Sequence, residues 1–342
     1  MLLDQLKANP LWMNCSIFAC ISIIIVLAGI LLQRSADSIA LRTGLQRAFV
    51  GVLILSAATS LPETASTIGA ARTGNADLAV SALMGATLTQ ISLLIIADIS
   101  SCRRGALTHL TPQFLLLFQG VGLVMLLAAA IVGMTAGPIA TLGRVDAWAL
   151  LILACYVAVI YFTYRIQAFP RWQPTGAERE ASHIEDLEAV CPAELAEIAQ
   201  EEQLCRGWKS GAVVGLFVGS AVVIFAAGWS TAVVAEVLAV QTGLGASFVG
   251  VTVLAFTTST PELFSVISSS RQGAYSLAFS NVIGSTMYNI FLLVIAEIAY
   301  TGGSIFHDVN PSAVFAAAVS AIITCVYLWG LLEHENRTVL RL

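Results

Sequence analysis

The sequence feature that most constrains the fold is an internal duplication. Residues 43–99 align without a gap with residues 242–298 at an offset of 199, and 27 of the 57 aligned pairs are identical. Residues 59–63 read TSLPE, and their counterparts at 258–262 read TSTPE. Identity at one fixed offset over such a length is the signature of a repeat. We therefore predict that two copies of one structural unit make up much of the protein.

The composition places both copies in a membrane. Hydrophobic residues make up 58% of the 342 residues and charged residues only 11%, whereas soluble domains are about 45–50% apolar and about a quarter charged. An apolar run of about 20 residues can cross a bilayer as a helix, which satisfies its own backbone in lipid. Gln33-Arg34 is predicted to end the first run, and no cleavage site follows it. Nine runs are long enough to cross: 15–33, 46–70, 76–99, 113–134, 146–166, 211–232, 247–269, 276–299 and 312–332.

Basic residues indicate the orientation of these spans. With the N-terminus outside, the inside segments hold 13 of the 16 lysines and arginines and the outside segments hold three. This bias agrees with the positive-inside rule. We predict a multi-pass protein of the cell (inner) membrane, partnered by the lipid bilayer, with its C-terminus cytoplasmic. Nothing in the composition indicates nucleic acid, and the oligomeric state stays open.

The two copies are predicted to be inverted, because an odd number of spans, five, separates them. The fifth span begins near Asp146, and its repeat would begin near position 345. The expected fold class is therefore all-α: a polytopic membrane protein with inverted-topology repeats and about nine transmembrane helices, five plus four, lacking the expected tenth. The predicted divisions are a first half (1–167, five helices), an acidic cytoplasmic loop (168–207) and a second half (208–342, four helices).

The loop at 168–207 carries nine acidic residues against three arginines. This composition favours a solvated cytoplasmic linker. A calcium-sensing regulatory loop is the alternative, although the spacing of an EF-hand is missing.

The TSxPE motif has the chemistry of a cation site. Thr59 and Glu63, four residues apart, share one helical face, and Pro62 leaves the backbone carbonyl of Ala58 without a hydrogen bond. Thr258 and Glu262 repeat this arrangement around the second proline. A carboxylate at mid-membrane depth is costly unless it is paired or faces water, and no basic residue is placed to pair with it. Oxygen ligands of this kind suit Na⁺, Ca²⁺ or Mg²⁺.

The next span of each copy carries a second column of polar residues. In the second copy, Asn281, Ser285 and Asn289 recur every four residues and so lie on one face. The first copy has Ala82, Ala86 and Gln90 at these positions. We therefore expect an asymmetric site with fewer ligands from the first copy.

The remaining polar residues have structural interpretations. A kink with one hydrogen bond would also explain a Pro-Glu pair, although duplication of the whole motif argues against it. Asp98 and Glu297 correspond, and interfacial capping is favoured over a second ion site. Asp37 and Glu236 are interpreted in the same way. The four histidines lie at span edges or in loops, which argues against a histidine proton relay: His109, His183, His307 and His334.

These motifs resemble those of the cation/calcium exchanger superfamily, and of its sodium/calcium exchangers and their bacterial members in particular. The resemblance covers nearly the whole chain. The family's repeats carry G-T-S-x-P-E on one helix and G-N-x-x-G-S-N-x-x-N (or D) on the next. Residues 58–63 (ATSLPE) and 257–262 (TTSTPE) match the first pattern except at its glycine, residues 280–289 (SNVIGSTMYN) match the second well, and residues 81–90 (SALMGATLTQ) match it poorly.

The resemblance implies a secondary active antiporter that exchanges Ca²⁺, or a related divalent cation, for Na⁺ by alternating access. It implies that Glu63 and Glu262 are the central ligands of the transported ions and that neutral side chains supply further oxygens. Those further ligands would be Thr59, Thr258, Ser60, Ser259, Ser285, Asn289 and, at the departing position, Gln90. No cofactor is implied beyond the transported Ca²⁺, Na⁺ or H⁺.

Alternative functions use the same residues. Gln90 is similar to a glutamine of the proton-coupled calcium exchangers, so exchange of Ca²⁺ for H⁺ is the first alternative. A degenerate membrane protein that binds a cation without transporting it is the second, favoured by Ala82, Ala86 and the expected absence of a tenth helix. An enzyme is not expected, because no nucleophile–base pair and no metal-binding histidines are positioned for intramembrane hydrolysis.

Overall fold

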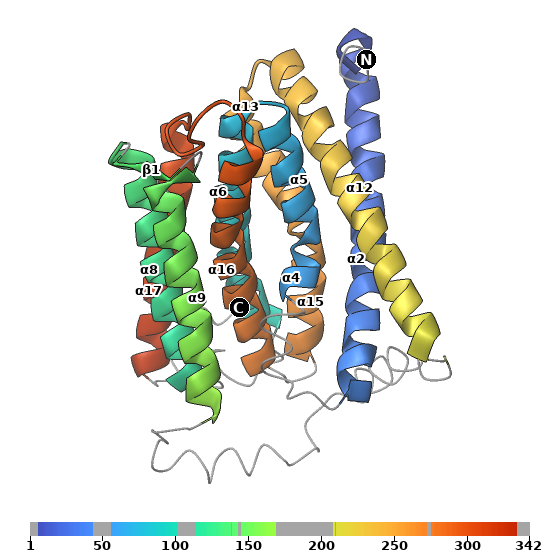
Figure 1. The fold of residues 1–342 in the computed structure, drawn as a ribbon. Coiled ribbons are helices and arrows are strands. Elements are labelled where there is room, and N and C mark those ends of the chain that lie inside the picture. The colour runs from blue at the N-terminus through green and yellow to red at the C-terminus, as the bar shows by residue number, and fades with distance from the viewer. Residues whose placement is uncertain are drawn as a thin grey trace.

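A computed structural model describes residues 6–43, 56–100, 114–137, 139–142, 145–168, 208, 210–271 and 275–333, and it is almost entirely helical (Figure 1). The long helices are α2 (Leu11–Thr43), α6 (Ala76–Ser100), α8 (Phe114–Thr135), α9 (Ala147–Ala168), α12 (Ser210–Thr242), α16 (Tyr275–Ala299) and α17 (Pro311–Glu333). The shorter ones are α4 (Ser56–Thr59), α5 (Leu61–Arg72), α13 (Ala246–Val249), the π-helix η3 (Gly250–Leu254), α14 (Ala255–Thr258) and α15 (Thr260–Arg271).

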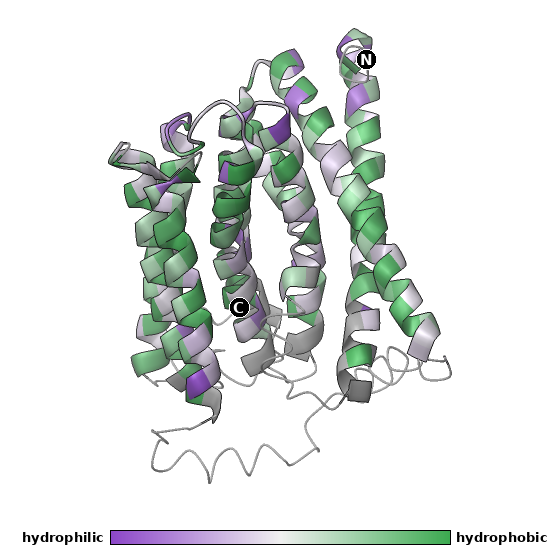
Figure 2. Cartoon of the chain, in the orientation of Figure 1, coloured by the Kyte–Doolittle hydropathy of each residue, from purple (hydrophilic) through white to green (hydrophobic). Residues whose placement is uncertain are grey.

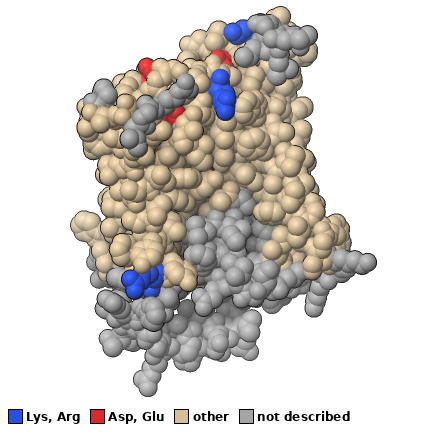
Figure 3. Space-filling view, in the orientation of Figure 1, with Lys and Arg blue, Asp and Glu red and all other residues tan. Residues whose placement is uncertain are grey.

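These helices have the lengths and composition of membrane spans. Within the described residues, seven helices are long and apolar enough to cross, and the bent pair Ala246–Thr258 and Thr260–Ile267 raises the number to eight. The predicted span at 46–70 begins outside the described residues, which include its later part as α4 and α5. Most of the helical ribbon in Figure 2 has the green of hydrophobic residues, and the charged residues visible in Figure 3 lie toward the two ends. The prediction of a polytopic helical membrane protein is confirmed.

The repeat extends further in the structure than in the sequence alignment. Adding 199 to the bounds of α2 gives those of α12 (11 + 199 = 210; 43 + 199 = 242), although these segments lie almost wholly before the aligned residues. The same sum converts the bounds of α5 into those of α15 and the bounds of α6 into those of α16. In Figure 1, α2 and α12 lie side by side and run in opposite directions. The copies are therefore inverted, as predicted.

Three local expectations need correction or completion. Gln33-Arg34 does not end the first helix, because α2 continues to Thr43, and α12 continues ten residues beyond the predicted end at 232. Polar residues alone do not stop a helix, and no glycine or proline follows Gln33 before Gly44. A short hairpin of β1 (Thr141–Leu142) and β2 (Val145–Asp146), which was not predicted, precedes α9. Apart from Ala168, the acidic loop at 168–207 lies outside the described residues.

The helices pack in layers around α6 and α16. These two helices contact each other and are the most deeply buried of the long helices. On one side lie α8, α9 and α17, and on the other side α5 and α15 separate the central pair from α2 and α12 (Figure 1). α2, α9, α12 and α17 turn most of their surface outward, as helices facing lipid do. The centre of the protein is thus formed by α4–α6 and their repeats α14–α16.

Both copies break their helix at the same serine. α4 stops before Ser60 and α14 before Ser259, and the two serines have nearly the same backbone angles (φ −87°, ψ 17° and φ −84°, ψ 6°). Pro62 and Pro261 occupy the second position of the helices that follow, where a missing N–H is tolerated. The axis bends by 44° at the second break. The repeated proline thus starts a new helix instead of kinking a continuous one.

Each break is covered by a glycine of the opposite copy. A Cβ atom added to Gly29 of α2 would lie 2.7 Å from Cγ of Pro261, and one added to Gly228 of α12 would lie 2.7 Å from the backbone oxygen of Pro62. The two glycines are themselves 199 residues apart, so the contacts are reciprocal. Because neither position has room for a methyl group, α2 and α12 can approach the broken helices closely.

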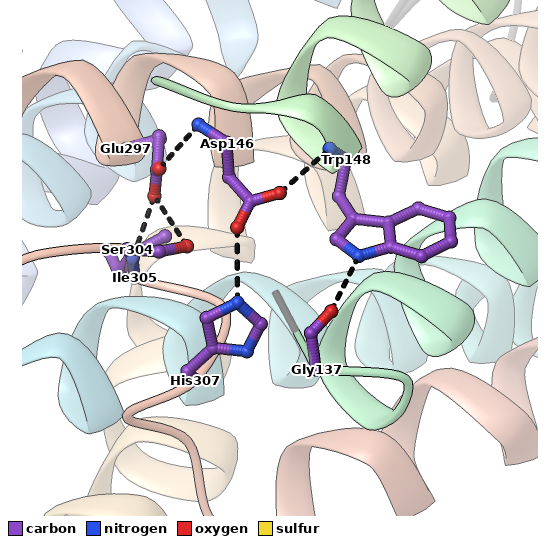
Figure 4. Close-up of polar contacts among 7 residues, drawn as sticks. All are labelled: Gly137, Asp146, Trp148, Glu297, Ser304, Ile305 and His307. Carbon is purple, nitrogen blue, oxygen red and sulfur yellow. Dashed lines mark hydrogen bonds and ion pairs between the residues drawn. The ribbon is translucent and has the colours of Figure 1, made fainter. Parts of the chain in front are cut away.

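The hairpin and the loop before α17 are held by two buried acids (Figure 4). Glu297 accepts hydrogen bonds from the backbone N–H of Asp146 at 3.0 Å and of Ile305 at 2.7 Å. The carboxylate of Asp146 accepts one from the N–H of Trp148 and lies 3.0 Å from Nε2 of His307. Glu297 therefore caps backbone groups at the end of its span, and His307 lies in a loop, as expected.

Candidate functional site

The two predicted central ligands meet in the middle of the helical bundle. The side chains of Glu63 and Glu262 are only 2% and 1% exposed. Oγ of Ser259 donates a hydrogen bond to Oε1 of Glu63 at 3.1 Å, and Oγ of Ser60 donates one to Oε1 of Glu262 at 3.3 Å. Each glutamate is therefore bound by the serine at the helix break of the other copy. The inverted repeat closes one shared site and does not form two separate ones.

Each glutamate keeps one oxygen free. Oε2 of Glu63 and Oε2 of Glu262 are buried and have no hydrogen-bond partner among the described residues. Among the described residues, no basic side chain pairs with either carboxylate. Both carboxylates accept hydrogen bonds from serine hydroxyls instead. The two acids lie close enough for their charges to interact. A buried pair of this kind needs protons or a cation to balance it.

Three neutral hydroxyls present lone pairs and not protons. Thr59 donates its proton to the carbonyl of Ser56 at 3.2 Å, and Thr258 donates its proton to the carbonyl of Ala255 at the same distance. Ser285 donates to the carbonyl of Val282 at 3.1 Å. A hydroxyl whose proton is held by its own helix has its lone pairs left for a cation. The chemistry of these oxygens fits a hard cation such as Na⁺ or Ca²⁺.

The two amide positions meet each other. Nδ2 of Asn289 donates to Oε1 of Gln90 at 3.0 Å, and Oγ1 of Thr286, which donates to the carbonyl of Val282 at 2.6 Å, lies 3.4 Å from the same oxygen. Gln90 and Asn289 are repeat mates (90 + 199 = 289), so this contact crosses between the copies. Oδ1 of Asn289 and Nε2 of Gln90 are buried without a partner among the described residues. Asn289 thus offers an unbonded oxygen to the interior, whereas the oxygen of Gln90 already accepts one hydrogen bond.

All nine predicted site residues are buried, and several neighbours were not anticipated. Asn281 does not offer a free amide: it donates to Ser265 at 3.0 Å and accepts from Ser56 at 3.4 Å, which ties α16 to α15 and α4. Thr286 also contacts the site through Gln90. The identical Thr87–Thr286 pair in the repeat was the available signal for Thr286. Ser265 had the same signal, because it is identical to its repeat mate Ser66, whereas Ser56 corresponds to Ala255 and had none.

The other acidic positions have mixed outcomes. The side chains of Asp37 and Asp98 lie outside what the structure describes, and so do His109, His183 and His334. Oε2 of Glu236 is buried without a partner among the described residues. No group of three or more His, Cys, Asp or Glu side chains that could hold a metal occurs in the described segments. The candidate site therefore consists of two carboxylates and neutral oxygens.

Comparison with known proteins identifies the class of this bundle. The sequence model of the sodium/calcium exchanger protein family matches residues 14–165 and 211–339. The chain belongs to this family, whose members are transporters. The superfamily resemblance found in the sequence is confirmed.

Relatives and solved structures agree with this assignment. The chain is 27% identical to the inner membrane protein YrbG of Escherichia coli over 275 residues, which are 79% of this chain and 75% of that protein. A segment of 52 residues is 46% identical to the sodium/calcium exchanger MaX1 of Methanosarcina acetivorans, and it covers 15% of each protein. The fold is similar to that of the sodium-calcium exchanger NCX_Mj, with a TM-score of 0.57, 13% identity and 95% of both chains covered. It is also similar to the H⁺/Ca²⁺ exchanger CAX, with a TM-score of 0.65, 15% identity, and 95% of this chain and 77% of that one covered.

Proposed function

We propose that this protein is a secondary active antiporter that exchanges Ca²⁺, or a related divalent cation, for Na⁺ by alternating access. The observation that carries the proposal is the reciprocal pair of glutamates, each held by the other copy's serine and each with a free, buried Oε2. Two carboxylates and a set of hydroxyl and amide oxygens suit these ions as substrates, with no resident cofactor. The family membership supports the same reading.

Charge balance accounts for exchange at one shared site. A single divalent cation neutralises both carboxylates, and so do two monovalent ions. The divalent and the monovalent ions cannot bind at the same time without excess positive charge in a low-dielectric interior. Binding of one ion therefore excludes the other. Because the two copies are inverted, the same contacts can form a state open to either side, and a bound ion can be carried across by exchange of the copies' conformations.

A second candidate is exchange of Ca²⁺ for H⁺ at the same residues. Gln90 favours it, because its oxygen is occupied by Asn289 and its free Nε2 is a donor, which does not bind a cation. With one oxygen fewer, the first copy's half of the site is less suited to hold a dehydrated Na⁺. Protons placed directly on Glu63 and Glu262 need no such ligand.

Flux in proteoliposomes tests the proposal and separates the candidates. Vesicles loaded with Na⁺ and diluted into Na⁺-free buffer at fixed pH should take up radioactive Ca²⁺ if Na⁺ is the coupling ion. Vesicles with an imposed pH gradient and no Na⁺ should take up Ca²⁺ if protons are. Ca²⁺ binding without flux under either gradient would point to a cation-binding protein that does not transport, and neither binding nor flux would refute the proposal.

The proposed orientation has the N-terminus outside and the loop at 168–207 and the C-terminus in the cytoplasm. Its support is the distribution of basic residues over the sequence. Ser182→Cys and Val339→Cys, made in a background without reactive cysteines, should both be protected from an impermeant thiol reagent in intact cells. Labelling of one of them from outside would rule out the nine-span arrangement.

A further inference from the structure

One buried hydroxyl next to the site has no partner. Thr67 lies in α5, is 1% exposed, and its Oγ1 forms no hydrogen bond with any described residue. Most buried hydroxyls in these helices donate to a carbonyl one turn earlier, as Thr64 does to Ser60 at 2.8 Å. The carbonyl that Thr67 would use belongs to Glu63, and it accepts from Ser66 at 3.1 Å but not from Thr67, whereas the carbonyl of Val282 accepts from both Ser285 and Thr286. A buried hydroxyl without a partner is costly, so Thr67 calls for an explanation.

The position of Thr67 on α5 directs it to the site. Pro62 and Gly69 mark the face of α5 that packs on α12, because both contact residues of that helix. At about 100° per residue, Thr67 lies about 40° from Glu63 and on the side of α5 opposite that face. Thr67 therefore shares the face of Glu63 on α5, one turn nearer the connection between α5 and α6.

The second copy has no such hydroxyl. The repeat mate of Thr67 is Val266 (67 + 199 = 266), which is 0% exposed. Two other buried hydroxyls, of Thr163 and Ser312, also lack partners in the described residues. Neither lies on a helix that carries a proposed ligand. Thr67 is thus an additional oxygen that breaks the symmetry of the site on one side.

We propose that Thr67 is a further ligand of the transported cation. It binds the ion at the end of the site that faces the α5–α6 connection. Its Oγ1 and the free Oε2 of Glu63 stand one helical turn apart on one face and bind the ion as it enters or leaves the central site. The inference rests on the proposed function. It makes the two directions of exchange unequal, because an ion on the other side meets a valine.

The test compares Thr67→Val, which removes the hydroxyl at nearly constant shape, with Thr67→Ser, which keeps it. Thr231→Val is the matched control, because the fully buried Thr231 donates to the carbonyl of Ala227 at 2.7 Å within α12, a helix that carries none of the proposed ligands. Two quantities are measured: the apparent KM for Ca²⁺ on each side of oriented proteoliposomes, and the increase in melting temperature that Ca²⁺ gives the purified protein. Wild type and Glu63→Gln are run in the same assays.

Thr67→Val should raise the KM on the α5–α6 side by roughly three- to tenfold, the effect of losing one neutral ligand, and leave the other side within about twofold. It should also reduce the Ca²⁺-dependent rise in melting temperature without lowering the melting temperature of the ion-free protein. Thr67→Ser and Thr231→Val should behave as wild type.

The outcomes separate the two proposals. If wild type exchanges Ca²⁺ and Glu63→Gln does not, unchanged values in Thr67→Val overturn the role of Thr67 alone. An equal rise of KM on both sides would also overturn it, because a ligand that acts on one side only cannot change the KM of both sides equally. If wild type does not transport but is stabilised by Ca²⁺, the melting comparison still decides the role of Thr67 in binding. A wild-type protein that neither transports nor binds Ca²⁺ removes both proposals.

Discussion

Repeat one and repeat two contribute matching carboxylates but different neutral groups to the shared site. Glu63 and Glu262 each accept a hydrogen bond from the opposite copy's serine, at 3.1 and 3.3 Å. Around them, Asn289 of repeat two faces Gln90 of repeat one, and Ser285 corresponds to Ala86. The glutamates and the break serines that bond across the copies are retained, whereas the amide pair and the hydroxyl ligands around them have diverged.

This difference has a physical reason. Each glutamate is bonded to the break serine of the opposite copy, so a change in one glutamate or one break serine alters both halves of the site. A neutral ligand such as Ser285 stabilises only its own half of the site. Divergence of such ligands adjusts ion preference and sidedness while the pair of charges is kept. The reciprocal contacts should therefore be the most sensitive to mutation.

The largest expected effect is that of removing either charge. Glu63→Gln and Glu262→Gln should each reduce Ca²⁺ exchange to background, because a divalent ion loses half of its counter-charge in a low-dielectric site. Both variants should remain folded, since neutralising a buried carboxylate relieves a desolvation cost. The measurements are gradient-driven Ca²⁺ uptake, size-exclusion profile and melting temperature.

Glu297→Gln is the matched control for charge removal. Glu297 accepts hydrogen bonds from two backbone N–H groups far from the site, and a glutamine would turn a donor toward one of them. This variant should lose roughly 1–3 kcal/mol of stability and keep its affinity for Ca²⁺. Exchange like that of wild type in Glu63→Gln would rule out the two-carboxylate site, and unfolding of both site variants would favour a structural role for the glutamates.

The next effect concerns the glycines that cover the helix breaks. A methyl group on Gly228 would collide with the backbone oxygen of Pro62, whereas one on Gly29 would meet the ring of Pro261. Because backbone yields less than a ring, Gly228→Ala should slow exchange and destabilise the protein more than Gly29→Ala, with overpacking costs of about 1–3 kcal/mol. Melting curves and initial rates of Ca²⁺ uptake show which of the two variants is affected more. Equal effects would mean that α12 and α2 adjust equally well.

Sequence reasoning recovered what the repeat encodes and missed what tertiary contacts decide. The duplication and the odd number of spans between its copies were enough to predict inversion, and the motif around Pro62 and its mate was enough to predict the buried glutamates. It could not predict that Ser60 binds the other copy's Glu262, because a contact between segments about 200 residues apart leaves no local pattern. The length of α2 was also underestimated: helix ends within a polar stretch depend on packing against α12, and only the apolar run is visible in the sequence.

A smaller change is expected at the amide pair. Gln90→Asn shortens the side chain by one methylene and should break its 3.0 Å contact with Asn289, so that the amide oxygen at position 90 no longer accepts from Asn289 and is free for an ion. We expect the ratio of Na⁺-driven to pH-driven Ca²⁺ uptake to rise by roughly three- to tenfold, the effect of one neutral contact. Asn289→Gln, which makes the pair larger, should lower the same ratio. If both variants keep the wild-type ratio, the amide pair does not select the coupling ion.

The smallest effect should come from exchanging the hydroxyl ligands between copies. Ser285 and Thr286 both donate to the carbonyl of Val282, and in the first copy only Thr87 donates to the corresponding carbonyl of Leu83. Ala86→Ser can therefore copy the geometry of its mate, with its proton on the helix and its lone pairs toward the ion.

Ser285→Ala should weaken Ca²⁺ affinity by roughly threefold, as expected for one neutral oxygen, and Ala86→Ser should strengthen Na⁺ inhibition of Ca²⁺ binding by a similar factor. The measurement is equilibrium Ca²⁺ binding to purified protein at several Na⁺ concentrations. Ser92→Ala is the control, since this hydroxyl lies on α6 and donates to the carbonyl of Leu88 at 2.8 Å. Ala86 is fully buried, so an Ala86→Ser protein that folds but binds Na⁺ no better would show that the first copy's half of the site has lost the geometry for a monovalent ion. The divergence between the repeats would then extend beyond side chains to the backbone that carries them.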